Sequence, residues 1–223
     1  MSATSRPRIG VVDYGMGNRR SVEKALERVG AEVWLTSDHE ILGACDGLVV
    51  PGVGAFPRGM ERLAELGLDQ LLHEQSTVAK PILGICLGMQ LLFDSSVEAK
   101  PAAGLGLIPG EVIPLRTHGL RLPHIGWNEV RFEQASALTA ALPGDGRPFY
   151  HVHSYTVRPA ASDDIVGTSE YGERFATIVA HGSIFGVQFH PEKSSTDGLA
   201  LLRSFVAFAA QGSVEQATNS TAA

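Results

Sequence analysis

A cysteine between two glycines is the first feature of this sequence that could do chemistry. Residues 84–88 read Gly-Ile-Cys-Leu-Gly, between an apolar run that predicts a strand and another that predicts a helix. This order is typical of the tight strand-to-helix turn that exposes a nucleophile, and a helix N-terminus favours a thiolate at Cys86. Glycine suits positions 84 and 88 because side chains there would collide with the neighbouring strand and helix. The alternative interpretation is a buried structural cysteine between two packing glycines.

A histidine and a glutamate near the C-terminus supply what a thiolate nucleophile needs. His190 ends an apolar strand, and Glu192 follows it by two positions. In an extended segment these side chains point to the same side, and Pro191 favours an extended backbone. We therefore predict Cys86 as the nucleophile, His190 as general base and acid, and Glu192 as the carboxylate that orients the imidazole. By itself His190 could be a surface histidine; the cysteine turn favours the catalytic interpretation.

A glycine-rich loop follows a predicted strand at residues 47–50. The loop reads Pro51-Gly52-Val53-Gly54. Backbone N–H groups in such a loop can stabilise an oxyanion, together with the N–H of the residue after the nucleophile. We predict oxyanion donors at Val53 or Gly54 and at Leu87. An ordinary strand-to-helix connection is the other interpretation.

The order of the elements predicts an α/β fold. β-branched runs alternate with helical patterns in the first half, which is typical of a parallel sheet covered on both faces. Short runs between Gly, Pro and Asp in the second half predict hairpins with antiparallel or mixed pairing. The predicted strands are residues 8–13, 31–35, 47–50, 81–85, 111–115, 127–132, 149–152, 165–168, 175–180 and 184–189. The predicted helices are residues 18–29, 57–77 with a break near Gly67, 87–94 and 196–209.

We predict a single domain over residues 8–210, with a central mixed, mostly parallel sheet flanked by helices. The 223 residues are 44% hydrophobic, which is enough for a full core. Residues 1–7 and 211–223 are small and polar, so both are predicted to be disordered tails. Trp34 and Trp127 are predicted to lie in or near the core.

Composition argues against several classes of protein. The formal net charge is -6, and Lys and Arg are scattered, unlike the clustered basic surface of a nucleic-acid-binding protein. No apolar run reaches the length of a membrane span, and no secretory signal is evident. Two cysteines without a zinc-type spacing suit a reducing compartment. We therefore expect a soluble, cytoplasmic protein.

No cofactor or metal is predicted. Residues 15–20 are similar to a dinucleotide-binding fingerprint, but Arg20 occupies the third glycine position and would obstruct helix–strand packing. The sequence contains no Gly-Lys dipeptide of a P-loop. His151 and His153 have the strand spacing of two metal ligands, but no third ligand is evident.

Together these segments resemble the class I glutamine amidotransferases, which carry a catalytic Cys-His-Glu triad. More narrowly, they are similar to the glutaminase subunits of imidazole glycerol phosphate synthase, an enzyme of histidine biosynthesis. The resemblance covers nearly the whole chain. It rests on DYGMGN at 13–18, PGVGAF at 51–56, GICLGMQ at 84–90, HIGWN at 124–128, VHSY at 152–155 and GVQFHPEKS at 186–194.

The resemblance implies a flavodoxin-like core and roles for the matching residues. Cys86, His190 and Glu192 match the triad, and residues 51–54 match an oxyanion strand whose peptide flips to point an amide inward. The residues that match the walls of the glutamine pocket are Gly52, Gln90, Glu98, His153, Ser154 and Tyr155. Asn18 and Tyr150 match positions near the subunit interface and the ammonia exit.

The implied partner is a (β/α)8-barrel cyclase subunit in a heterodimer. It receives ammonia through a protected passage and makes imidazole glycerol phosphate and AICAR. Two residues depart from the family pattern: Arg19 stands where an aliphatic residue is expected, and His151 stands where an aromatic is usual. The second departure lies near the expected interface and leaves gating by Tyr150 open.

The sequence leaves three alternatives. The chain could serve another synthase, such as anthranilate, aminodeoxychorismate or pyridoxal phosphate synthase; the DYGMGN and HIGWN strings argue against this. Cysteine peptidases of the PfpI type share the cysteine turn, but we do not expect them to carry His-Pro-Glu near the C-terminus. A non-catalytic scaffold that regulates a barrel partner is the third, and the intact Cys86, His190 and Glu192 argue against it.

Overall fold

The computed structural model describes residues 6–99 and 102–220, with side chains described as far as residue 211. The strands are β1 (Arg8–Val12), β2 (Glu32–Thr36), β3 (Gly47–Gly52), β4 (Ile82–Cys86), β5 (Phe93–Ser96), β6 (Ala102–Ala103), β7 (Ile108–Pro114), β8 (His124–Phe132), β9 (Gly146–His153), β10 (Tyr155–Pro159), β11 (Ile165–Tyr171), β12 (Glu173–His181) and β13 (Ile184–Val187). The helices are α1 (Arg19–Arg28), α2 (His39–Gly43), α3 (Phe56–Glu65), α4 (Leu68–Thr77), α5 (Leu87–Leu91) and α6 (Ser195–Ser220), with 3-10 turns η1 (Ser162–Asp164) and η2 (Pro191–Lys193).

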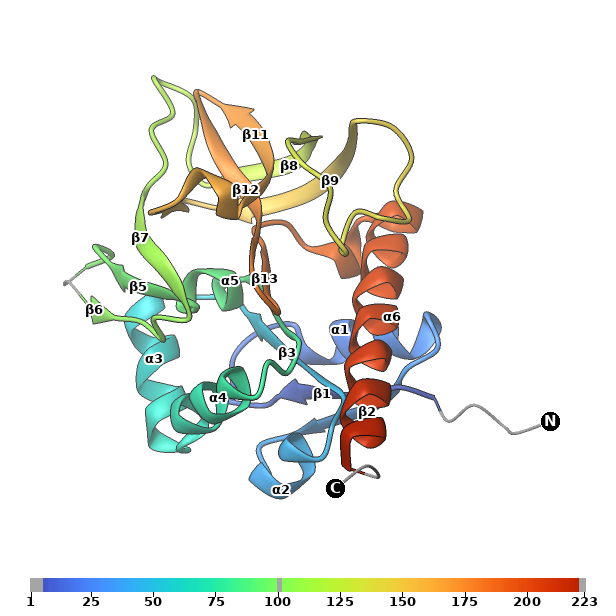
Figure 1. Ribbon diagram of the computed structural model, residues 1–223. Helices are drawn as coiled ribbons and strands as arrows, with labels where there is room; N and C mark the ends of the chain where they lie inside the picture. The colour runs from blue at the N-terminus through green and yellow to red at the C-terminus, as the bar shows by residue number, and fades with distance from the viewer. Residues whose placement is uncertain (1–5, 100–101, 221–223) are drawn as a thin grey trace.

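The strands form one mixed sheet within the described residues, in the order β2-β1-β3-β4-β13-β12-β10-β7-β5-β6. β11 pairs with β12 and β8, and β9 pairs with β8. The run from β2 to β13 is parallel, as predicted for the first half. Strands β8 to β12 pair antiparallel, as predicted for the second half, and they form the upper part of Figure 1.

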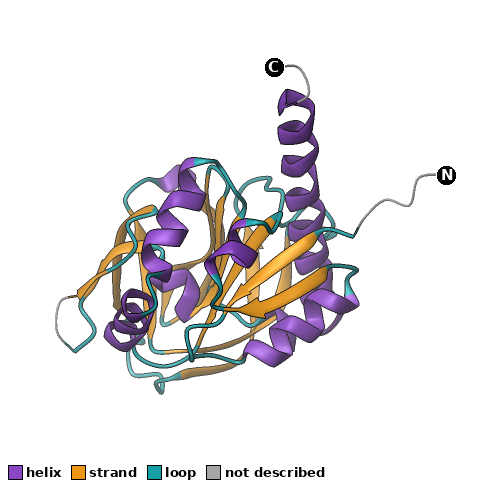
Figure 2. Cartoon of the chain, turned by 90° about the horizontal axis from the view of Figure 1, so that it is seen from below, coloured by secondary structure: helices purple, strands orange, loops and turns teal. Residues whose placement is uncertain are grey.

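Two hydrophobic cores lie on the two faces of the parallel strands, and Figure 2 shows helices on both sides of them. Alternate side chains of a strand point to opposite faces. Ile9 and Val11 of β1 accordingly belong to the core under α1 and α6, while Val12 belongs to the core under α3, α4 and α5. Val49 and Val50 of β3 divide in the same way. The predicted α/β class with helices on both faces is confirmed.

Some predicted elements have different limits. The helix predicted over residues 87–94 ends at Leu91, because the N–H groups of Leu105, Leu107 and Gly106 bond to the carbonyls of Leu91, Leu92 and Phe93. This pairing with a distant segment continues the chain as β5. α2, β5, β6 and β10 were not predicted.

The chain ends and the two tryptophans also differ from the prediction. α6 continues to Ser220 instead of ending near residue 209, since no proline interrupts its last turns. Residues 1–5 and 221–223 of the predicted tails lie outside the described residues, and the domain limits 8–210 stay a prediction. The predicted core position of the tryptophans is wrong: Trp34 and Trp127 are 43% and 55% exposed.

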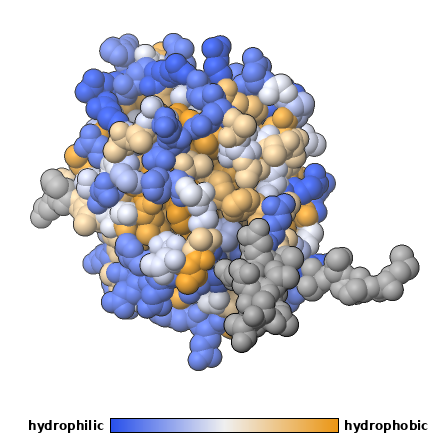
Figure 3. All heavy atoms as spheres, in the orientation of Figure 1, coloured by the Kyte–Doolittle hydropathy of each residue, from blue (hydrophilic) through white to orange (hydrophobic). Residues whose placement is uncertain are grey.

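The visible surface is not uniform. In Figure 3, hydrophilic residues cover the upper end, over β11, β12 and their loops, while apolar residues appear in the middle of this face. Among the described helices, none combines the length and the apolar character needed to cross a bilayer.

Candidate active site

Cys86 occupies a strained turn between β4 and α5. Its backbone has φ 56° and ψ -110°, a conformation that residues with side chains rarely adopt. A Cβ added at Gly84 would lie 2.6 Å from the carbonyl oxygen of Gly88, and one added at Gly88 would lie 1.7 Å from that of Val50. The prediction that side chains at positions 84 and 88 would collide with neighbouring backbone is therefore confirmed. The turn presents the Cys86 side chain at the carboxyl end of the parallel strands.

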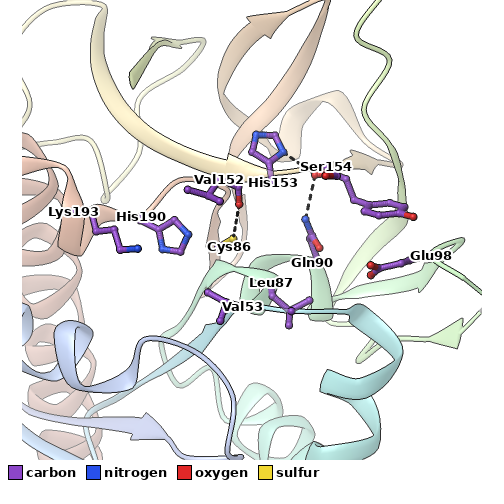
Figure 4. A pocket seen from close by; sticks show the side chains of 12 residues that line it. Val53, Cys86, Leu87, Gln90, Glu98, Val152, His153, Ser154, His190 and Lys193 are labelled. Atoms are coloured by element: carbon purple, nitrogen blue, oxygen red, sulfur yellow. Dashed lines mark hydrogen bonds between the residues drawn. The ribbon is translucent and has the colours of Figure 1, made fainter. Parts of the chain in front are cut away.

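His190 and Glu192 meet as the sequence predicts, but by a different backbone path. His190 Nδ1 lies 2.9 Å from Glu192 Oε1, and both side chains are buried. The predicted extended segment is wrong, because Glu192 lies in the 3-10 turn η2, which folds it back toward the imidazole. Since a carboxylate only accepts, Nδ1–H donates to it, and Nε2 is left for Cys86. Figure 4 shows the His190 ring facing the cysteine sulfur.

Opposing effects set the charge of this imidazole. Burial alone lowers the pKa of His190, but hydrogen bonds and charge interactions with Cys86 and Glu192 outweigh it and raise the pKa to about 9. His190 is therefore an imidazolium at neutral pH. A cation beside the sulfur stabilises a thiolate, which is the reactive form of cysteine.

Two further groups contact the cysteine sulfur. Cys86 Sγ lies 3.7 Å from the Val152 carbonyl oxygen and 3.8 Å from Gln188 Nε2. Gln188 Oε1 accepts from Gln90 Nε2 at 3.1 Å, and Gln90 Nε2 also donates to the Tyr155 carbonyl at 3.2 Å. Gln188 was missed as a site residue, although an amide inside the apolar run 184–189 was a usable signal, since a buried polar group needs partners.

A cavity of about 280 Å³ opens beside the sulfur, near the ~300 Å³ lower limit of small-molecule sites. Its lining brings together most of the predicted site residues: Val53, Gly54, Cys86, Leu87, Gln90, Glu98, His153, Ser154, Tyr155 and His190. Val152 and Lys193 line it too. In Figure 4, His190 and Lys193 lie on one side of Cys86, and Gln90 and Glu98 lie on the other.

Four predicted residues lie outside the lining of this cavity: Glu192, which is buried behind His190, and Gly52, Asn18 and Tyr150. Gly52 pairs in register with Cys86, and its added Cβ would lie 2.6 Å from the Tyr14 hydroxyl. Asn18 precedes α1, and its Oδ1 accepts from the Ser21 hydroxyl at 2.7 Å. Tyr150 packs edge-on against Trp127, with 6.2 Å between ring centroids, and its carbonyl accepts from the His190 N–H at 2.9 Å.

The segment that follows β1 holds the glycine-rich loop through a hydrogen bond from Tyr14. The buried Tyr14 hydroxyl donates to the Pro51 carbonyl at 2.6 Å. Burial raises the pKa of Tyr14, and the charge of Cys86 adds to the increase. Just beyond the loop, the Glu98 carboxylate accepts a hydrogen bond at 2.7 Å from the N–H of Phe56, the first residue of α3. Arg19, the unexpected residue after Asn18, forms an ion pair with Asp13.

A second group of polar residues lies behind the cavity wall. His124, His151 and His153 are buried together, and His153 alone of the three lines the cavity. Within the described residues, no set of three or more His, Cys, Asp or Glu side chains is placed to hold a metal ion.

Comparison with known proteins gives a consistent picture. The family model described as "Glutamine amidotransferase class-I" matches residues 10–208. A protein of Moorella thermoacetica named "Imidazole glycerol phosphate synthase subunit HisH" is 49% identical over 197 residues, covering 88% of this chain and 93% of its own. A protein of the same name from Bacillus cereus is 50% identical over 208 residues, covering 93% and 95%.

Solved structures agree in fold. The structure described as PurLQS from Thermotoga maritima has a TM-score of 0.72 at 22% identity, covering 92% of this chain and 99% of that one. A structure described as a glutamine amidotransferase has a TM-score of 0.70 at 20% identity, covering 90% and 98%.

Proposed function

Because the chain belongs to the glutamine amidotransferase class-I family, we propose that it is the glutaminase subunit of an imidazole glycerol phosphate synthase. It hydrolyses glutamine to glutamate and ammonia and supplies the ammonia for histidine biosynthesis. The observation that carries the proposal is the 2.9 Å His190–Glu192 pair beside a cysteine in a strained turn.

In the proposed mechanism, the Cys86 thiolate attacks the side-chain amide carbon of glutamine. The oxyanion that forms accepts hydrogen bonds from the N–H of Leu87 and from that of Val53 or Gly54. His190 gives its Nε2 proton to the leaving nitrogen, the C–N bond breaks, and ammonia departs from a γ-glutamyl thioester. Water then loses a proton to His190 and attacks the thioester, the C–S bond breaks, and glutamate leaves with the thiolate restored.

The pocket residues have proposed tasks in substrate binding. Gln90, Glu98, His153, Ser154 and Tyr155 hold the glutamine, which is supported by their shared lining of one cavity with Cys86. A free amino acid suits a cavity of this size that carries several polar side chains on its wall. Each oxyanion donor is worth about 2.7–4 kcal/mol, so a resting enzyme with one donor turned away would be slower by a factor of about 10² to 10³. Partner-dependent rotation of the loop at Val53 and Gly54 is the proposed basis of activation.

The proposed partner is a (β/α)8-barrel cyclase subunit in a cytoplasmic heterodimer. A group of exposed apolar side chains supports a docking face at β8 and the loop before it: Leu120, Leu122, Ile125 and Trp127. This face borders the cavity, because Ile125 pairs in register with Val152, which lines it. Asn18 and Tyr150 are proposed near this interface, where ammonia leaves. Cys45 and Cys86 both have free thiols, which suits a reducing compartment.

Glutamate release tests the proposal directly. The chain is assayed alone, with the histidine-pathway cyclase, and with the cyclase plus its nucleotide substrate, and Cys86→Ala is assayed beside the wild type. Cys45→Ala is the matched control, since Cys45 is equally buried but lies at the end of α2, away from the cavity. We expect strong activity only in the complete mixture, its loss in Cys86→Ala and its retention in Cys45→Ala. A silent complete mixture with a folded chain would reject the proposed partner.

A further inference from the structure

Two of the three buried histidines, His153 and His124, form a directional hydrogen-bond chain that the proposed chemistry does not use. At one end, His153 Nδ1 lies 2.9 Å from the Tyr155 carbonyl oxygen. His153 Nε2 lies 3.0 Å from His124 Nδ1, and His124 Nε2 lies 3.3 Å from Asn128 Nδ2. Asn128 Nδ2 also donates to the Glu170 carbonyl at 2.9 Å. The chain therefore crosses from β11 through β8 and β9 to the cavity wall.

The two terminal carbonyls determine where every proton lies. A carbonyl only accepts, so His153 carries a proton on Nδ1. At the other end the Asn128 amide nitrogen only donates, so His124 Nε2 accepts from it and His124 carries its proton on Nδ1. That proton is donated to His153 Nε2, which is therefore a bare acceptor. Both rings are consequently neutral, and each has its proton on Nδ1. A second proton on His153 would point N–H at the N–H of His124.

The surroundings of the rings favour the same neutral state. Burial lowers the pKa of His124, and it lowers the pKa of His153 to about 3. His151 stacks on His124 at 5.0 Å. Burial lowers the pKa of His151 well below its usual range, and this effect outweighs the hydrogen bond from Nδ1 to the Phe149 carbonyl, which raises the pKa. Tyr171 of β11 stacks on the other side of His124 at 4.1 Å. The positive charge of His190 also disfavours protonation of His153.

The chain meets the cavity at an oxygen that has two tasks. The Tyr155 carbonyl accepts from His153 Nδ1 and from Gln90 Nε2, which uses both of its lone pairs. Gln90 Nε2 in turn donates to Gln188, whose amide reaches the Cys86 sulfur. Movement of this carbonyl would therefore release the Gln90 amide and displace the wall formed by Ser154 and Tyr155.

We propose that His124 and Asn128 are positioning residues for the substrate pocket, which hold His153 in its neutral Nδ1-protonated form and thereby fix the Tyr155 carbonyl and Gln90. The inference rests on the proposed glutaminase function. Because neither residue touches Cys86 or His190, their loss weakens substrate binding and leaves the chemical step intact.

Paired variants of His124 separate this task from packing. His124→Phe keeps the ring that stacks on Tyr171 but removes the N–H; His124→Asn keeps an N–H near the position of Nδ1 but removes the ring. In the assembled glutaminase mixture, we expect His124→Phe to raise KM for glutamine about tenfold with kcat within about twofold, and His124→Asn to restore most of the KM. The polar but partly exposed Asn128 offers a variant that folds readily, and Asn128→Leu should raise KM about threefold.

The protonation states are measured separately, by long-range ¹H–¹⁵N spectra of the isolated wild-type chain. We expect Nδ1-protonated neutral signals for His124 and His153 at pH 6. An Nε2-protonated or charged His153, or a wild-type KM in both His124→Phe and Asn128→Leu, would overturn the inference, as would a larger KM defect in His124→Asn than in His124→Phe. If the wild-type mixture released no glutamate, the proposed function would fail, while the spectra would still decide the hydrogen-bond chain.

Discussion

Replacing Gly88 by alanine tests whether the close packing of α5 on β3 builds the turn at Cys86. The added Cβ would lie 1.7 Å from the Val50 carbonyl oxygen, whereas real Cβ atoms stay beyond 3.0 Å from such neighbours. The obstacle is backbone, so no side-chain rotation relieves it. α5 and β3 would have to separate by roughly 1.3 Å.

Two losses follow from this separation. Overpacking costs about 1–3 kcal/mol of stability, and a backbone obstacle inside two buried elements places the cost at the upper end, about 3 kcal/mol. Val50 leads directly into the loop that carries Val53 and Gly54, while Leu87 begins α5. A displacement of about 1 Å between proposed oxyanion donors costs about 10² in rate, so we expect kcat to fall at least that far.

Gly43→Ala is the matched control. Gly43 ends another five-residue helix, α2, and its added Cβ meets only a Gln75 side-chain nitrogen at 3.8 Å, an ordinary contact. Urea denaturation measures stability, and glutamate release with the cyclase and nucleotide measures kcat. Gly43→Ala should match the wild type within about 1 kcal/mol. If Gly88→Ala also matches the wild type in the urea midpoint and in kcat, the close packing of α5 on β3 does not build the turn at Cys86.

Four other changes give separate tests. Raising the pH should lower the free energy of unfolding of the chain. The pKa of His190 is about 9 in the folded state and about 6.5 in the unfolded state. The contribution of His190 to stability is therefore complete below about pH 6.5 and is lost as the pH rises through 9. The urea midpoint should follow this fall, and His190→Gln should flatten it; an equally steep fall in the variant would contradict the assignment. In Glu192→Gln the amide oxygen can still accept from His190 Nδ1, and the amide nitrogen takes the place of Oε2, which has no hydrogen-bond partner among the described residues. The variant should lower kcat about 10²-fold with little change in KM, because the negative charge beside His190 is lost. An unchanged kcat would remove the carboxylate from the mechanism. Tyr14→Phe removes the hydrogen bond to the Pro51 carbonyl and should lower the free energy of unfolding, measured with urea, by about 1–2 kcal/mol. An unchanged urea midpoint would contradict this prediction. Trp127→Ala should weaken cyclase binding about 30-fold by calorimetry with unchanged stability, and unchanged binding would move the docking face elsewhere.

The first half of the fold was predictable because its signals are local. The apolar runs at residues 8–13 and 47–50 correspond to β1 and β3, and the helical period broken at Gly67 corresponds to α3 and α4. β5 and β10 escaped prediction because their pairing comes from distant segments. The carbonyls of Leu91 and Leu92, for example, are taken by the N–H groups of Leu105 and Leu107, which no local pattern announces.

The site also has parts that local sequence signals predict and parts that depend on distant segments. Cys86, His190 and Glu192 stand in short strings whose residue types state their chemistry, so their meeting could be predicted from the sequence. The turn that brings Glu192 back could not, because Pro191 alone favoured an extended backbone. His124 showed no role by itself, since its importance comes from a ring on β9 and an amide four residues away.

The strand that joins the two halves of the sheet determines the geometry around the sulfur. β13 is parallel to β4 and antiparallel to β12, and Gly186 pairs with Gly84. Gln188 and His190 follow β13 at alternate positions, and both reach Cys86. A slip of one residue would turn both side chains away from the sulfur. A Cβ at Gly186 would lie 2.6 Å from Met89 Cγ and 2.9 Å from Val179 Cγ2, so no other residue of β13 fits this position without displacement. The glycine that fixes the register thus places the Gln188 amide and the His190 imidazole at the Cys86 sulfur together.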